Sequence, residues 1–215
     1  MSIEQDALTL AQWLSPAFPI GAFAYSHGLE AAINSGLIKS GGDLSDWLED
    51  ILQHGSGRND CILLRAAYVC STPAALSEVN DTGLAFAASA ERRLETSVQG
   101  AAFCKTSAAV WGGEASGLIY PVAVGASAAR LSLNVDLTAV MFVQSMTGNL
   151  VSAAQRLMPL GQTDGQAILA ALLPLCQEVA AGTKQAGLDD LESTAFLSDI
   201  AAMQHETLQP RIFRT

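Results

Sequence analysis

The sequence predicts an all-α protein, a single globular domain of many short-to-medium helices. Apolar residues recur with helical spacing along most of the chain, whereas no segment shows the sustained alternation that is typical of a strand. The connections between the helical stretches are short, and none has the composition of a flexible linker. A chain of 215 residues can bury a core of its own, so we expect residues 1–215 to form one domain.

Two prolines mark the first boundary. Pro16 and Pro19 restrict the backbone, so the segment around them is expected to be an extended or turned entry. A helix is expected from about Phe23 onward. That helix places His27 and Glu30 at positions i and i+3, close enough to share a hydrogen bond or a metal ion.

The next helix has one apolar face. Asp43 is a suitable N-cap for it and Gly55 a suitable end. His54 lies in its last turn, where a histidine suits the helix dipole. The positions expected to be buried recur every three to four residues and are Leu44, Trp47, Leu48, Ile51 and Leu52.

Residues 82–111 are compatible with one long helix or with two pieces. Within them Leu94, Val98 and Ala101 are spaced for burial on one face. The following stretch, GLIYPVAVG, is rich in β-branched residues but has Pro121 in its middle. It is expected to be a connection, or a helix that begins at this proline.

Two more helical stretches lie toward the C-terminus. Residues 168–179 carry an apolar stripe that Pro174 is expected to kink or interrupt. A final helix is expected to bury a stripe made of Leu188, Leu191, Ala195, Phe196, Ile200 and Met203.

The composition favours contacts with other proteins. Charged residues make up only 15% of the chain, against about 25% in typical domains, so apolar and small residues must reach the surface. A monomer with an alanine-rich surface is the alternative. The net charge of −10 argues against a nucleic-acid ligand, and there is no GxxxxGK[ST] loop that would hold a nucleotide phosphate.

The four cysteines are Cys61, Cys70, Cys104 and Cys176, and no two of them form a CxxC pair. We expect buried thiols in a reducing compartment rather than a zinc or redox site. The acidic N-terminus lacks the basic start of a secretory signal, and prolines or polar residues interrupt the apolar stretches. A cytoplasmic protein that spans no membrane is expected.

A catalytic centre is hard to assemble from these residues. The three histidines, His27, His54 and His205, lie on separate helical segments, and no GxSxG is present. One alternative function is a small metal-dependent hydrolase that uses His27, Glu30 and His205. The donor count is too low to favour it, and no metal site is predicted.

Two charged stretches have two interpretations each. Arg92, Arg93 and Glu95 are expected to form a solvated face with internal ion pairs, or else a cluster that faces a partner. The last residues, MQHETLQPRIFRT, contain an Ile-Phe pair between two arginines. Although so short a tail is normally disordered, this composition favours docking, so residues 204–215 are taken as a C-terminal docking tail.

Five stretches together resemble the UreF family of urease accessory proteins. They are WLSPAFPIGAFAYSHGLE (13–30), ERRLETSVQGAAFCK (91–105), YPVAVG (120–125), NLVSAAQRLMPLGQTDGQ (149–166) and HETLQPRIFRT (205–215). They follow the family's order and span nearly the whole chain.

The resemblance implies an all-helical homodimer with no catalytic centre, acting in the cytoplasm as an adaptor or co-chaperone. Its partners would be the scaffold accessory protein UreD (also called UreH), the GTPase UreG and apo-urease. The assembled complex would insert nickel while the GTPase hydrolyses GTP, so no tightly bound cofactor is expected on this chain.

The resemblance also assigns a set of partner-binding residues. They are Tyr25, His27, Glu30, Gln162, Asp164, Gln166, Arg211, Phe213 and Arg214. The tail residues among them would become ordered only when the scaffold is bound. For residues 162–166, a plain loop with Asp164 as an N-cap is equally compatible with the sequence.

This chain departs from the family pattern at two places. Ala22 replaces a glycine after PIG, and alanine would be strained there if that position needs a positive φ. In the tail, Leu208, Gln209 and Pro210 replace the usual residues, which removes an aromatic side chain and one backbone N–H donor.

Overall fold

The structure is a computed structural model that describes residues 2–114 and 117–215. Every regular element within these ranges is helical. In chain order the elements are α1 (Ile3–Trp13), η1 (Ala22–Ala24), α2 (Leu29–Asn34), α3 (Gly41–His54), α4 (Ser56–Val69), α5 (Pro73–Ala85), α6 (Ala90–Trp111), α7 (Tyr120–Arg130), α8 (Val135–Leu157), α9 (Gln162–Gly182), η2 (Leu188–Asp190) and α10 (Phe196–His205). The predicted all-helical single domain is confirmed.

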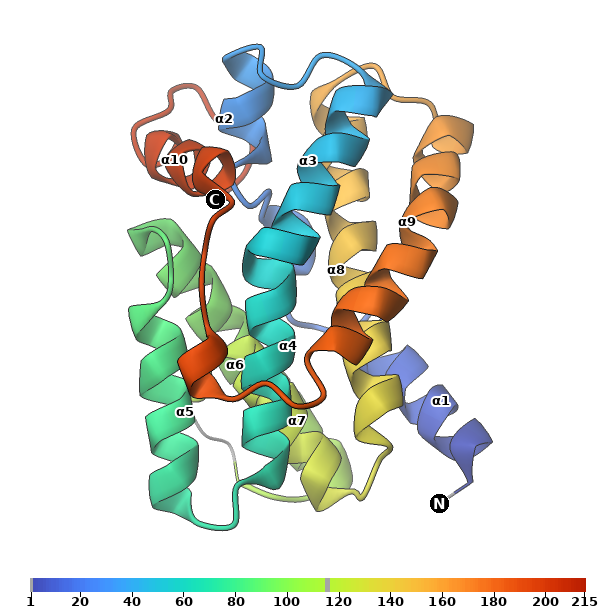
Figure 1. The fold of residues 1–215 in the computed structure, drawn as a ribbon, viewed down its shortest axis with the longest axis vertical. Coiled ribbons are helices and arrows are strands. Elements are labelled where there is room, and N and C mark those ends of the chain that lie inside the picture. Colours follow the sequence, from blue (N-terminus) through green and yellow to red (C-terminus); the bar gives the residue numbers. More distant parts are fainter. Residues whose placement is uncertain (1, 115–116) are drawn as a thin grey trace.

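Helices α3 and α4 follow one another along the long axis of the molecule, with α5 and α6 on one side and α8 and α9 on the other (Figure 1). The main core lies where α1, α6 and α8 meet α4 and α7. There Trp13 meets Phe103 edge-on, with ring centroids 5.1 Å apart. A second core joins α2, α3, α8 and α9, and it includes Phe213 from the end of the chain.

Helix α3 agrees well with its prediction. All five residues expected on its buried face are buried, and Gly55 follows its last residue, His54. The N-cap is Ser40 rather than Asp43, because these two residues form a capping box in which each side chain bonds the other's backbone amide.

The region 82–111 is divided between two helices, with Ser89 as the N-cap of α6. The prediction for its buried face was wrong. Leu94 and Val98 are 58% and 41% exposed, and Ala101 is exposed as well. The opposite face of α6 is buried instead, although it carries Glu95 and Gln99. Glu95 is buried with partners from distant parts of the chain, and Gln99 donates to Glu95 one turn away.

Two prolines behave differently. Pro121 lies in the first turn of α7, as the sequence predicts. Pro174 does not interrupt α9, which runs past it to Gly182. Because proline has no N–H, Pro174 cannot donate a hydrogen bond to the carbonyl of Ala170. Both residues lie on the exposed side of α9, where water can bind that carbonyl.

The expected helix over residues 188–203 is broken. The amides of Thr194 and Ala195 both donate to the carbonyl of His54 at the end of α3, at 2.9 and 3.2 Å. These bonds cap α3 and hold the connection in a non-helical form, so α10 can begin only at Phe196. The stripe is split accordingly: Leu191 and Ala195 are buried, whereas three members of α10 are exposed, namely Phe196, Ile200 and Met203.

By length and composition, α8 and α9 would be long and apolar enough to cross a membrane, which is also true of many core helices. They pack against each other, and α8 additionally contacts α1, α2, α4 and α7. The cysteines Cys61, Cys104 and Cys176 are buried, as expected, and Cys70 is partly buried.

Candidate functional site

The entry segment makes two unusual turns before α2. Gly21 has a φ of 74°, and the residue after it, Ala22, begins η1 without a positive φ, so alanine is not strained there. His27 and Gly28 then both adopt left-handed backbone conformations, with φ of 61° and 80°. Helix α2 therefore begins at Leu29, later than the sequence suggests.

Gly28 lies against the backbone of α10. A Cβ on this glycine would lie 2.7 Å from the amide nitrogen of Ala202, so only glycine fits both the conformation and the space. This contact brings α2 and α10 together. As a result Glu30 of α2 faces His205, the last residue of α10.

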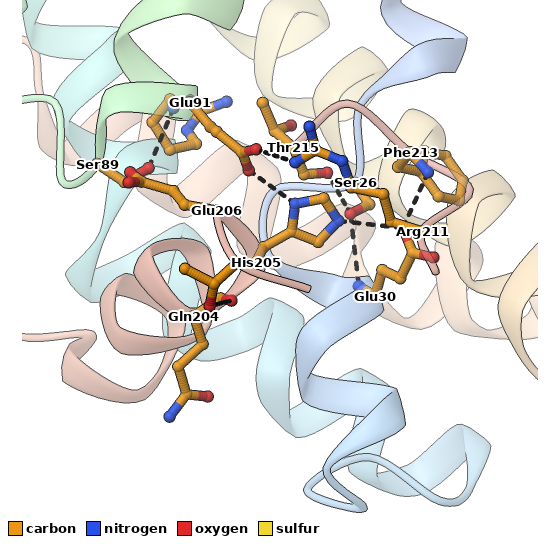
Figure 2. A network of polar contacts seen from close by, with 12 residues as sticks. Ser26, Glu30, Ser89, Glu91, Gln204, His205, Glu206, Arg211, Phe213 and Thr215 are labelled. Carbon is orange, nitrogen blue, oxygen red and sulfur yellow. Dashed lines mark hydrogen bonds and ion pairs between the residues drawn. The ribbon is translucent and has the colours of Figure 1, made fainter. Parts of the chain in front are cut away.

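His205 is fully buried between two carboxylates (Figure 2). Its Nε2 lies 3.0 Å from Glu30 Oε2, and its Nδ1 lies 2.7 Å from Glu91 Oε2 at the start of α6. Arg211 forms an ion pair with the other oxygen of Glu91. Two carboxylates, one imidazole and one guanidinium thus form one cluster, which we call the His205 cluster.

Glu30 also holds the backbone of residues 206–215, the segment after α10 that we call the tail. Its carboxylate accepts hydrogen bonds from the amides of Ile212 at 2.6 Å and Phe213 at 2.9 Å. Burial opposes ionisation of this carboxyl group. The hydrogen bonds from His205 and from these amides outweigh burial and hold the pKa of Glu30 below its usual value.

The end of the tail is held by a second set of contacts. The amide of Arg214 donates to the carbonyl of Ala24, and the amide of Ser26 donates to the carbonyl of Thr215, both at 2.8 Å. The Thr215 hydroxyl donates to Glu95 Oε2 at 2.9 Å. None of these bonds needs an amide at residue 210, so Pro210 does not weaken them.

Glu95 is the centre of this second set, which we call the Glu95 cluster. It pairs with Arg92 one turn earlier, accepts from Gln99 Nε2 at 3.1 Å, and lies 3.7 Å from His27 Nδ1. Burial opposes its ionisation, but the positive charge of Arg92 and the contact with His27 lower the pKa of Glu95 to about 2.

His27 connects the Glu95 cluster to α4. Its Nε2 lies 2.9 Å from the Ser56 hydroxyl. Burial, together with the nearby charge of Arg92, lowers the pKa of His27 and favours the neutral ring. A neutral imidazole can interact with a hydroxyl through one ring nitrogen and with a carboxylate through the other. These two contacts of His27 help to hold residue 27 in its left-handed backbone conformation.

Two small cavities adjoin the Glu95 cluster. Their volumes are about 60 and about 50 Å³, and both are lined by His27, Asp60, Arg92 and Thr96. Burial, opposed by Arg92 and assisted by Glu95, raises the pKa of Asp60 to about 7. The interior next to the tail is therefore polar and holds a carboxyl group that titrates near neutral pH.

The structure brings together six of the nine residues predicted to bind partners. They are Tyr25, His27, Glu30, Arg211, Phe213 and Arg214. Tyr25, Glu30 and Phe213 are buried inside the chain, and the Phe213 ring lies under Arg156, whose guanidinium carbon is 4.2 Å from the ring centroid. In the structure the tail packs on its own chain, and the expectation that it becomes ordered only when a partner is bound stays a prediction.

The other three predicted residues are elsewhere. Gln162, Asp164 and Gln166 are exposed in the first turns of α9, where the N-cap is Gly161 and not Asp164. Their role in partner binding stays a prediction.

The metal-dependent hydrolase receives no support from this geometry. His205 and Glu30 are bonded to each other, whereas His27 belongs to the Glu95 cluster. Among residues 2–114 and 117–215, no three His, Cys, Asp or Glu side chains converge as metal ligands.

The role of Glu91 was not predicted from the sequence, and Glu95 was expected on a solvated or partner-facing surface although it is buried. Both glutamates belong to the ERRLE stretch, which reads as a solvated helix face. Within this part of α6, the apolar residues Leu94 and Val98 predict that their own side of the helix is buried. In the structure that side is exposed, and the side that carries Glu95 is buried.

The fold and this site define a single-domain helical protein whose buried charges hold its own C-terminal tail. The UreF family model matches residues 38–173. The chain is 50% identical over 212 residues to the urease accessory protein UreF of Ruegeria pomeroyi, covering 99% of this chain and 98% of that protein. It is 52% identical over 208 residues to the urease accessory protein UreF of Roseobacter denitrificans, covering 97% and 93%. The chain belongs to the UreF family of urease accessory proteins.

Proposed function

We propose that this chain is an adaptor that joins the scaffold protein UreD/UreH and the GTPase UreG, so that nickel is inserted into apo-urease with GTP hydrolysis by the GTPase. Membership of the UreF family over nearly the full length supports this role. In this proposal the chain acts in the cytoplasm, catalyses no reaction and binds no cofactor tightly.

The adaptor role is supported mainly by which side chains of the tail are buried and which are exposed. Phe213 is 3% exposed and anchors the tail, whereas Ile212 beside it is 72% exposed and Arg214 is exposed as well. Phe23, which lies next to the Ala24 carbonyl that Arg214 bonds, is also 72% exposed. A fixed backbone that presents apolar and cationic side chains can bind a partner without a large ordering cost.

This arrangement changes the roles of the predicted tail residues. We propose that Phe213 supports the binding surface from inside, while Ile212 and Arg214 contact the scaffold. Arg211 is 41% exposed at its side chain and already pairs with Glu91, so it positions the tail. Tyr25 and Glu30 support the surface in the same indirect way.

The proposed homodimer needs an apolar surface, and α10 offers one. Phe196, Ile200 and Met203 form an exposed stripe on it, being 65%, 47% and 52% exposed, with Leu197 beside them at 55%. Contiguous exposed apolar side chains usually mark an interaction surface, and α10 exposes four large ones within ten residues.

The test is co-purification of the chain with a tagged scaffold protein and the GTPase. Ile212→Asp is expected to reduce capture about tenfold, a loss of about 1.4 kcal/mol. Leu8→Asp is the matched control, because Leu8 is 74% exposed but lies on α1, and its capture is expected to stay near the wild-type level.

Capture of Ile212→Asp at the level of the Leu8→Asp control would remove the tail from the binding surface. Full activation of urease in cells that lack this chain would remove the adaptor role altogether.

A further inference from the structure

We propose that the His205 cluster is a proton-dependent latch: the tail is held while His205 carries its second ring proton, and it is released when that proton is lost. This property belongs to the chain itself and does not depend on which partner the tail meets.

The first step is the protonation state that the contacts require. Both ring nitrogens of His205 lie within hydrogen-bond distance of carboxylate oxygens, at 2.7 and 3.0 Å. An ionised carboxylate only accepts hydrogen bonds, and a neutral imidazole has only one N–H to donate. The cluster is satisfied when one additional proton is present and the ring is an imidazolium.

The second step places that proton on the ring. Glu30 accepts three hydrogen bonds, from His205 and from the amides of Ile212 and Phe213, and this favours its ionised form. Glu91 accepts from His205 and pairs with Arg211. The charges of the two acids and the two bases then cancel inside a site where the histidine has no exposed surface.

The third step is the consequence of deprotonation. Without the additional proton, one carboxylate faces a bare nitrogen lone pair, and the cluster carries one uncompensated negative charge. A buried charge without a partner is strongly destabilising. Rotating Glu30 or Glu91 away from the ring relieves the repulsion, but Glu30 then loses Ile212 and Phe213, and Glu91 loses Arg211.

The charged groups around His205 come from every element packed against it. Helix α2 supplies Glu30, α6 supplies Glu91 and the tail supplies Arg211. On the neighbouring residue, the carboxylate of Glu206 accepts from the amide of Ala90 at 2.8 Å instead of facing the ring. The Glu95 cluster is also nearby, where Arg92 and Glu95 neutralise each other. On α10 itself, the carboxylate of Asp199 accepts from the Ser193 hydroxyl at 2.6 Å.

The closed tail therefore binds one more proton than the released tail once free histidine is deprotonated. By linkage, the equilibrium constant for tail opening rises about tenfold per pH unit over that range. Most other contacts of the tail, such as Arg214 with Ala24, involve no titrating group and give no such slope.

The experiment measures hydrogen-exchange protection by NMR at the Ile212 and Phe213 amides of the full chain, from about pH 6.5 to 8.5, a range in which histidine commonly titrates. Protection factors, corrected for intrinsic exchange, are expected to fall about tenfold per pH unit. The amide of Ala123 inside α7 serves as the reference for global unfolding, and its protection is expected to fall only by the few-fold that the titration of Asp60 near pH 7 gives.

Two variants assign the slope to the cluster. In His205→Gln no imidazolium exists, and the slope is expected to vanish. In Glu91→Gln the amide can donate to Nδ1 while Nε2–H donates to Glu30, so a neutral ring satisfies the site and the slope is again expected to vanish. Glu91→Gln keeps the shape of the site, and it decides the question if His205→Gln does not fold.

His54→Gln is the matched control, because this histidine is exposed at the end of α3. It is expected to keep the wild-type slope. A flat wild-type profile would overturn the proposal. A slope that persists in Glu91→Gln would also overturn it, and Asp60→Asn would then show whether the titrating group is the buried carboxyl beside the cavities.

Discussion

The Thr215 hydroxyl donates a 2.9 Å hydrogen bond to Glu95, across 120 positions of the sequence. This bond joins Thr215 to the second turn of α6, and the same carboxylate also contacts Arg92 and His27. A single buried charge therefore links the tail, α6 and the entry segment.

Glu95→Gln is expected to destabilise the protein by about 3 kcal/mol at pH 7, because Arg92 is left in the interior without its counter-charge. The folded-state pKa of Glu95, about 2, lies below its ordinary value. Its contribution to stability is therefore present above the ordinary pKa of a glutamate and is lost as the pH falls toward 2.

Urea unfolding at pH 7 and at pH 3 measures both effects. The variant is expected to lose less stability on acidification than the wild-type chain. The control is Glu49→Gln, whose side chain is exposed on α3. An acid slope in Glu95→Gln equal to that of the wild type would contradict the assignment of this charge.

Gly28→Ala is expected to cost more than 2 kcal/mol. The new Cβ would meet the backbone of Ala202 at 2.7 Å, and the residue would keep a φ of 80°. Gly21→Ala is the matched control, since its φ is 74° but no atom lies within 4 Å of the new Cβ. That change is expected to cost only about 1 kcal/mol of backbone strain. Thermal unfolding compares the two, and equal losses would show that the contact with α10 is unimportant.

Asp60→Asn is expected to stabilise the protein at alkaline pH. Burial raises the pKa of Asp60 to about 7, so folding is penalised as the pH rises from the ordinary pKa of an aspartate through 7. The asparagine carries no charge and avoids that penalty. The stability difference is expected to grow from near zero at about pH 4 to about 4 kcal/mol at pH 8.5, most of it gained below pH 7.

Denaturant unfolding over this pH range measures the difference, with Asp46→Asn on the exposed side of α3 as the control. A difference that does not change with pH would mean that Asp60 is ionised in the folded protein without cost.

The sequence predicts an element well when a single apolar face determines its orientation. Helix α3 has such a face, and all five of its predicted core residues are buried. For α6 the same reasoning selects Leu94 and Val98, which are exposed. The buried face of α6 contains Phe103 together with Glu95, and Glu91 and Glu95 have partners that lie 114 to 120 residues away. No local period in the sequence contains that information.

The resemblance grouped several residues of the candidate site, but it did not predict how they are arranged. Glu30, Arg211 and Phe213 were assigned to one functional set by resemblance. In the structure Phe213 bonds Glu30, and Arg211 belongs to the same cluster through Glu91. Their burial was not predicted, because a short charged tail gives no sign that its own chain supplies two buried glutamates to receive it. The left-handed turn at His27 was also hidden, because histidine is enriched at positive φ but most histidines still have negative φ.

The last prediction concerns the exposed stripe on α10. If this stripe forms the homodimer interface, a charge at its centre must be buried without a partner whenever two copies associate, which costs several kcal/mol. Ile200→Asp is therefore expected to convert the dimer into a monomer. The fold itself should lose less than about 0.5 kcal/mol, because Ile200 is 47% exposed in the single chain. Sedimentation velocity measures the association state, and Val69→Asp, at a 77% exposed position at the end of α4, is expected to remain dimeric. A dimeric Ile200→Asp would assign the interface to another face, and a monomeric wild-type chain would show that the stripe is covered by a different protein.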